Sequence, residues 1–154
     1  MLLLGRHSLL KSTPMENINN RITPKFITAL APGEIFVFGS NLQGQHWGGA
    51  ARIAYEKFGA VWGEGVGLQG NSYAIPTMQG PVSTIKPYVD EFIHFAQSHP
   101  TNQFLVTRIG CGIAGFTDAE IAPLFREALP LSNVFLPQEW FAILLDRVDD
   151  SLNQ

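Results

Sequence analysis

The sequence contains little cysteine and little charge. Cys111 is the single cysteine among 154 residues, so no disulfide forms within the chain and cysteine-rich zinc frameworks are excluded. Charged residues make up 15% of the chain, and the formal net charge is −3. A generic nucleic-acid binder needs a positive stripe that releases counterions from phosphates, so that class is excluded as well. A small anionic ligand held by backbone N–H groups remains compatible with this composition, because those groups add no formal charge.

Long apolar runs are also missing. No run approaches the roughly 18 residues that a membrane span needs, so no membrane partner is expected. The chain starts MLLLGRHSLLK, and its first apolar stretch ends at Gly5. A signal peptide needs about 7–15 apolar residues, which excludes one here. A lone cysteine fits a reducing compartment, and the sequence therefore predicts a cytoplasmic protein.

The domain boundaries follow from where patterning begins and ends. Residues 1–21 show little pattern and are expected to form an N-terminal arm, with Met15 as an alternative start of the chain. Residues 22–148 hold enough apolar material for one domain, and residues 149–154 are expected to form a C-terminal tail.

Short apolar runs alternate with helical spacing along this domain. The patterns predict strands at residues 34–38, 72–76, 103–109 and 133–136, with a loop at 59–70. They predict helices at residues 23–30, 48–58, 84–98 and 117–128, and a final turn or helix at 138–147. Thr117 and Glu120 have the spacing of a capping box, and Pro123 predicts a kink. This alternation predicts an α/β domain with a largely buried sheet.

Glycine carries the functional signal. Of the 15 glycines, ten lie in residues 39–80 and three in residues 110–115. Each cluster follows a predicted buried strand, where open α/β sheets bind ligands. Glycine lets backbone N–H groups curl around an anion, and a helix N-terminus behind them adds positive potential. Two such loops would clamp a phosphate or diphosphate; the alternative is that the glycines only permit tight turns.

The second cluster also matches the dinucleotide fingerprint G-x-G-x-x-G. Gly110, Gly112 and Gly115 have this spacing between a predicted strand and a predicted helix. The acidic residue expected about 20 residues later is missing, so the motif favours phosphate over NAD. A Rossmann-type nucleotide-dependent enzyme is the corresponding alternative.

Two segments resemble the ligand loops of macro domains. FGSNLQGQHWGGAARIAYEKFG (38–59) is similar to their first ligand loop and helix, and TRIGCGIAGFTDAEIAPLF (107–125) is similar to their diphosphate loop. The resemblance covers residues 34–136 and is nearest the terminal ADP-ribose glycohydrolase class and its bacterial and phage relatives. It implies a three-layer α/β fold with a mixed central sheet, helices on both faces, and a cleft that binds ADP-ribose.

The resemblance also implies where the ligand lies. Asn41 and the backbone of the first loop would face the distal ribose, residues 112–115 would wrap the diphosphate, and Phe116 would lie against a sugar. The implied ligand-binding residues are Ser40, Asn41, Gly48, Gly49, Gly110, Gly112, Ile113, Ala114, Gly115 and Phe116. No cofactor and no metal are implied. The expected partner is ADP-ribose or an ADP-ribosylated molecule, a nucleic acid only through an ADP-ribosylated end. Glu34 is the acid nearest the position that reads adenine.

Catalytic residues of that class are replaced here. Met78 and Ala114 stand where the resemblance would put a lysine nucleophile and an aspartate, and neither side chain titrates. A binding module is therefore favoured. The alternatives are an ADP-ribosyl hydrolase that uses Asn41 and an oriented water, and an interaction domain with an unused cleft.

Three further side chains have two interpretations each. Cys111 lies between glycines at a helix entrance, which would lower its pKa, with His46 as its spatial partner; the alternative is a small buried cysteine. Trp47 either covers a sugar or base or anchors its loop. Asp118 is interpreted as an ordinary first-turn helix residue.

Overall fold

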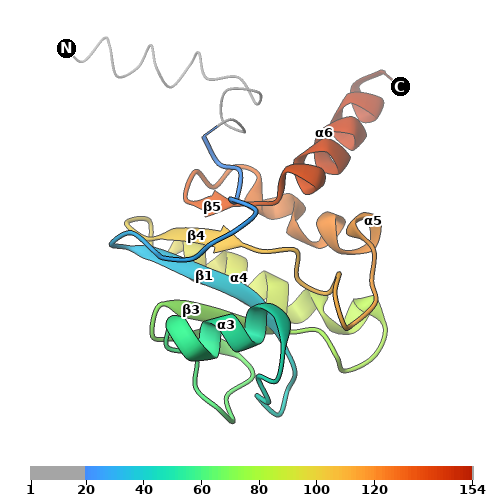
Figure 1. The fold of residues 1–154 in the computed structure, drawn as a ribbon. Helices are drawn as coiled ribbons and strands as arrows, with labels where there is room; N and C mark the ends of the chain where they lie inside the picture. The colour runs from blue at the N-terminus through green and yellow to red at the C-terminus, as the bar shows by residue number, and fades with distance from the viewer. Residues whose placement is uncertain (1–19, 154) are drawn as a thin grey trace, which may run out of the picture.

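The computed structural model describes residues 20–153, and within them five strands form one sheet in the order β2-β3-β1-β4-β5. The central strand β1 (Glu34–Ser40) pairs in parallel with β3 (Ser72–Pro76) on one side and β4 (Gln103–Val106) on the other. Strand β5 (Val134–Phe135) continues the parallel pairing, and β2 (Gly67–Gln69) is antiparallel to β3. The sheet is mixed, as predicted (Figure 1).

Helices cover both faces of this sheet, and Figure 1 shows α3 and α4 on opposite sides of β1. Helix α3 (Gly49–Lys57) packs on one face, where its small alanines approach two phenylalanines of β1. Helix α4 (Lys86–Gln97) packs on the other face together with α6 (Gln138–Asn153). The three-layer α/β architecture is therefore confirmed.

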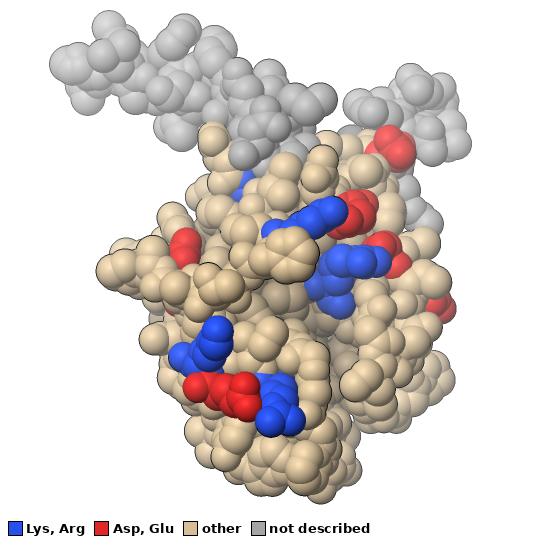
Figure 2. Space-filling model, in the orientation of Figure 1, with Lys and Arg blue, Asp and Glu red and all other residues tan. Residues whose placement is uncertain are grey.

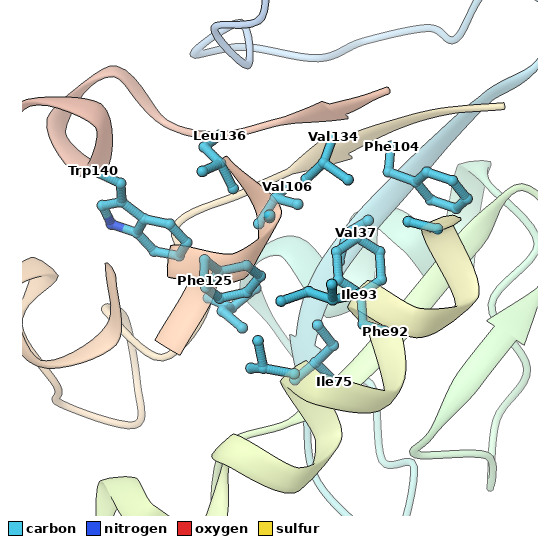
Figure 3. Close-up of a cluster of buried hydrophobic side chains, with 14 of the residues drawn as sticks. Val37, Ile75, Phe92, Ile93, Phe104, Val106, Phe125, Val134, Leu136 and Trp140 are labelled. Atoms are coloured by element: carbon cyan, nitrogen blue, oxygen red, sulfur yellow. The ribbon is translucent and has the colours of Figure 1, made fainter. Parts of the chain in front are cut away.

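The two clusters of buried side chains explain why the sequence of β1 is continuously apolar. Phe36 and Phe38 face α3, whereas Ile35 and Val37 face the larger cluster on the α4 side. Figure 3 shows that larger cluster, in which side chains from β1, β3, β4, α4 and α6 meet. A strand that is buried on both faces does not alternate apolar and polar residues, and this is typical of parallel sheets.

The segment between residues 23 and 30 is not helical, and that prediction is wrong. Ile22 forms a parallel bridge with Leu136, and the backbone N–H of Thr23 donates to the Leu136 carbonyl at 2.9 Å. Phe26 is 87% exposed, so the segment has no continuous apolar stripe to bury. A short helix without such a stripe lacks the packing that would stabilise it.

Several other helix and strand boundaries differ from the predicted ones, and local sequence features explain the change in α5. Strand β4 ends at Val106 rather than at residue 109, and β2 lies in the stretch predicted as loop. The capping box at Thr117 is confirmed, but α5 (Asp118–Ile121) ends after four residues and continues as the 3-10 helix η2 (Ala122–Ala128). Pro123 explains the change, because it cannot donate the next α-helical hydrogen bond.

The ends of the domain also differ from the prediction. Helix α6 continues to Asn153, beyond residue 147 and through most of the predicted tail, because no proline or glycine interrupts it there. A further 3-10 turn, η1 (Val82–Thr84), precedes α4. Within the described residues, no helix combines the length and apolar character needed to cross a membrane.

Arg21, placed in the predicted arm, is part of the domain. Its side chain is 5% exposed and donates to three carbonyls, those of Val134 at 3.0 Å, Leu129 at 2.8 Å and Ala128 at 3.1 Å. The guanidinium carbon also lies 5.6 Å from the centre of the Phe141 ring. Arg21 thus ties the first described residues to β5, η2 and α6.

We expect Arg21→Ala to lower the free energy of unfolding by about 3–5 kcal/mol, because two buried carbonyls and one partly buried carbonyl lose a charged donor. Denaturant unfolding monitored by circular dichroism measures the change. Arg52→Ala is the matched control: it removes an exposed ion pair with Glu56 and should cost less than about 1 kcal/mol. Equal effects of the two substitutions would contradict a special role for Arg21.

Candidate functional site

Two cavities meet beside the carboxyl ends of β1 and β4. The smaller has a volume of about 360 Å³ and the larger of about 820 Å³. Gly49, Ala50, Thr107 and Arg108 line both of them. We call the two cavities together the cleft. Figure 2 shows the hollowed face of the molecule, with basic side chains around its middle.

Most of the ligand-binding residues predicted from sequence line the smaller cavity. They are Ser40, Asn41, Gly48, Gly49, Gly110, Gly112, Ile113 and Ala114. Gly115 and Phe116 do not: the Gly115 N–H closes the loop on the Gly112 carbonyl at 3.0 Å, and Phe116 packs against the core. The cavity also includes Thr77 and Arg108, which sequence reasoning missed.

The loop after β4 presents unused backbone donors. Gly110 has φ +75°, and a Cβ there would lie 2.9 Å from Ile121 Cδ1, so only glycine fits this turn. The Phe116 N–H donates to the Gly110 carbonyl at 2.8 Å, which holds the loop in an arc. At the crest of that arc, residues 112–114 donate no backbone N–H to any described residue. These three N–H groups therefore have no hydrogen-bond partner among the described residues, and their residues line the smaller cavity.

The start of α3 supplies a second set of unpartnered backbone N–H groups. Its N-cap is Gly48, which offers no side-chain cap, and its first turn has no acidic residue. The first N–H groups of a helix have no partner within the helix and carry partial positive charge. Gly49, Ala50 and Ala51, which provide them, line the smaller cavity.

Helix α5, which follows the second loop, does not present an uncapped N-terminus, contrary to expectation. Helix α5 has four residues, and its capping box already uses two of the backbone donors at its start. The Thr117 hydroxyl accepts from the Glu120 N–H at 3.2 Å, and the Glu120 carboxylate accepts from the Thr117 N–H at 2.9 Å. The long helix that a dinucleotide fingerprint opens is therefore missing after Gly115.

Two polar side chains of the first loop have structural partners. The Asn41 amide donates to the Gln45 carbonyl at 2.9 Å and accepts from the Gln45 N–H at 2.8 Å. The Ser40 hydroxyl donates to the Gly65 carbonyl. Each polar atom of the Asn41 side chain has a partner in the loop, so this residue shapes the loop; its second amide N–H has no partner among the described residues.

Asp118 connects three side chains beside the second loop. Its carboxylate accepts from Arg108 at 3.0 and 2.7 Å, and from the Trp140 indole at 2.7 Å. The Cys111 thiol lies 3.5 Å from the same carboxylate. The Arg108 guanidinium, with the indole, lowers the pKa of Asp118. Asp118 is therefore more than a first-turn residue, and only the fold brings its partners together.

Cys111 is not an activated nucleophile. Burial and the neighbouring Asp118 carboxylate raise the pKa of its thiol to about 12, opposite to the lowering expected from sequence. His46 is not its partner: its ring packs edge-on against Phe38 on the α3 side, whereas Cys111 packs against the cluster on the other face. His46 is 1% exposed, and its Nε2 lies 2.9 Å from the Val61 carbonyl.

Trp47 lies in the wall of the smaller cavity and is 69% exposed. Its ring meets Trp62 edge-on at 4.6 Å between centroids. Met78 and Ala114 line the same cavity and bring no titratable group. Among residues 20–153, no three His, Cys, Asp or Glu side chains are grouped so that they could hold a metal ion.

The larger cavity is mainly apolar, and Thr23 and Glu139 are among its polar lining residues. The Thr23 side chain is buried, and its hydroxyl has no hydrogen-bond partner within the described part of the chain. Glu139 contributes a carboxylate, and Phe26 an exposed ring. Glu34, the acid suggested from sequence, starts β1 at the opposite end of the sheet, where it accepts from the Ala31 N–H at 2.8 Å.

Comparisons with known proteins add no family assignment: no protein-family model matches the chain, and no curated protein matches it either. What the cleft can bind follows from its own residues.

We expect iodoacetamide to alkylate Cys111 at pH 8 at least about 100-fold more slowly in the folded protein than in urea, since a thiol needs its thiolate to react. Mass spectrometry of time points measures both rates on the single cysteine. The urea sample is the control, because unfolding returns the thiol to its ordinary pKa of about 8.5. Equal rates in the two samples would contradict the raised pKa.

Proposed function

We propose that the cleft binds ADP-ribose or a closely related nucleoside diphosphate. One observation carries the proposal: N–H groups from the start of α3 and from residues 112–114, with no partner in loop or cap, line the same cavity. Converging backbone donors at the carboxyl ends of parallel strands suit the oxygens of a diphosphate. This arrangement also lets a chain with net charge −3 bind an anion.

The larger cavity suits the nucleoside half of such a ligand. Its volume lies within the range of ordinary small-molecule sites, and its apolar walls suit a planar base. The Glu139 carboxylate is an acceptor for an exocyclic amino group such as that of adenine, and the unpartnered Thr23 hydroxyl gains a hydrogen bond when a polar ligand atom reaches it. Because the two cavities share a wall, a molecule that joins a nucleoside to a diphosphate can occupy both.

The side chains support binding rather than turnover. Asn41 is an amide that holds its loop and cannot remove a proton, Cys111 is protonated at neutral pH, and Met78 and Ala114 cannot transfer a proton. Asp118 is ionised but is engaged by Arg108 and Trp140. An ADP-ribosylated macromolecule is a suitable physiological partner, because binding without hydrolysis would leave its modification in place.

Calorimetric titration of the full chain tests this function. We expect ADP-ribose to bind at least about 100-fold more tightly than adenosine, because hydrogen bonds to charged oxygens are about twice as strong as neutral ones. ADP should fall between them, since it retains the diphosphate and lacks the distal ribose. Comparable affinities for adenosine and ADP-ribose would contradict a diphosphate site, and no heat with any of the three would refute the proposal.

Gly112→Val tests the second loop. Gly112 does not have positive φ, and nothing lies within 4 Å of a Cβ placed there, so valine fits the unliganded protein without strain. Its side chain would occupy the space that the diphosphate needs. We expect ADP-ribose affinity to fall at least about 100-fold with an unchanged melting temperature. Gly115→Val is a poorer test, because φ is +84° there and valine would strain the backbone.

Ala119→Val is the control for Gly112→Val: it adds similar bulk on exposed α5, and Ala119 does not line the cleft. It should bind ADP-ribose as the unmodified protein does. If Gly112→Val binds normally, residues 112–114 do not hold the phosphate, and if it unfolds, the loop glycines serve the turn alone.

A further inference from the structure

We propose that Arg108 is the side chain that binds the phosphate of the ligand where the two cavities meet, and that Asp118 positions it. This inference rests on the proposed function and adds a charged, specificity-determining contact to a site otherwise made of backbone donors. Sequence reasoning gave Arg108 no role.

The position of Arg108 is the first argument. Two residues beyond the end of β4, it lines both the smaller and the larger cavity. Lys25 and Lys57 also bring positive charge, but they line only the larger cavity. Arg108 is thus the basic residue at the junction, where the linker between a nucleoside and a distal group has to pass.

The geometry of the guanidinium is the second argument. Arg108 Nε donates to one carboxylate oxygen of Asp118 at 3.0 Å, and Nη2 donates to the other at 2.7 Å. This parallel fork fixes the plane of the group. Nη1 lies on the opposite edge and donates to no described residue. Because the side chain is 53% exposed, a ligand can reach that edge.

Asp118 is itself held in place, which makes it a positioning residue. The Trp140 indole donates to its Oδ1 at 2.7 Å, and Trp140, near the start of α6, is fully buried in the core. The capping box fixes the backbone on either side of it. An arginine that is restrained in this way loses little side-chain entropy when it binds a phosphate.

A comparison within the chain separates this pair from an ordinary surface ion pair. Arg52 and Glu56 form a single contact at 2.9 Å between neighbouring turns of α3, and neither residue lines a cavity. Arg108 and Asp118 are ten residues apart and lie in different elements. Loss of Arg52 should therefore leave ligand affinity unchanged, and loss of Arg108 should not.

The experiment titrates ADP-ribose and adenosine into the full chain and four variants. We expect Arg108→Gln to weaken ADP-ribose binding at least about 10-fold, to leave adenosine unchanged and to reduce the salt dependence of ADP-ribose affinity. Arg108→Lys keeps the charge but cannot form the paired hydrogen bonds of a guanidinium. Its ADP-ribose affinity should lie between that of the unmodified protein and that of Arg108→Gln. Arg52→Gln is the charge-matched control and should bind both ligands normally.

Asp118→Asn tests positioning by the sign of its effect. Removing a negative charge near an anion would by itself tighten ADP-ribose binding. If Asp118 orients Arg108, affinity falls several-fold instead, and the salt dependence falls with it. Tighter binding by this variant would overturn the positioning role.

The two proposals fail in distinguishable ways. If the unmodified protein binds ADP-ribose and Arg108→Gln binds it within about twofold, the role of Arg108 is overturned and the proposed function stands. If the unmodified protein does not bind ADP-ribose, both proposals fail. If Arg108→Gln also loses adenosine or does not fold, Arg108→Lys decides: normal ADP-ribose affinity without the fork overturns the proposal, and intermediate affinity supports it.

Discussion

The parallel pairing of β1 with both of its neighbours is the constraint on which the rest of the structure depends. Parallel strands need crossover connections, and those connections place α3 on one face and α4 on the other. Burial on both faces selects the apolar run of β1. The same pairing makes β1 and β4 end side by side, so the loops that follow them approach each other. This pairing sets the place of the cleft, and the loop residues form most of its lining.

The proposed anion site is compatible with an acidic chain because many of its donors are backbone N–H groups. The uncapped start of α3 and the arc at residues 112–114 offer N–H groups without adding formal charge. The charge of Arg108 is offset by the carboxylate of Asp118, so the pair adds an oriented guanidinium but no net charge. Such a site favours ligands whose oxygens match fixed donors over anions in general.

Residue type alone is a poor guide to function in the loops of this protein. Asn41, Ser40 and His46 all have side chains used in active sites, yet each bonds to a loop carbonyl or amide. Long loops need such bonds because their backbone groups lack the regular partners of helices and strands. Arg108, to which the sequence analysis gave no role, lines both cavities, and Asp118, interpreted as an ordinary helix residue, bonds to it.

The sequence by itself determined the features that depend on neighbours along the chain. The apolar run of β1, the capping box at Thr117 and the glycines at two strand ends are local signals, and the α/β fold follows from them. The eight predicted residues that line the smaller cavity were implied by the resemblance of two loops to those of macro domains. Only the tertiary structure decided that Arg21 bonds to carbonyls more than 100 residues away, that Trp140 bonds to Asp118, and that residues 23–28 line a cavity rather than form a helix. These outcomes depend on contacts between distant segments, and no local period or propensity encodes which buried carbonyl or indole a side chain will meet.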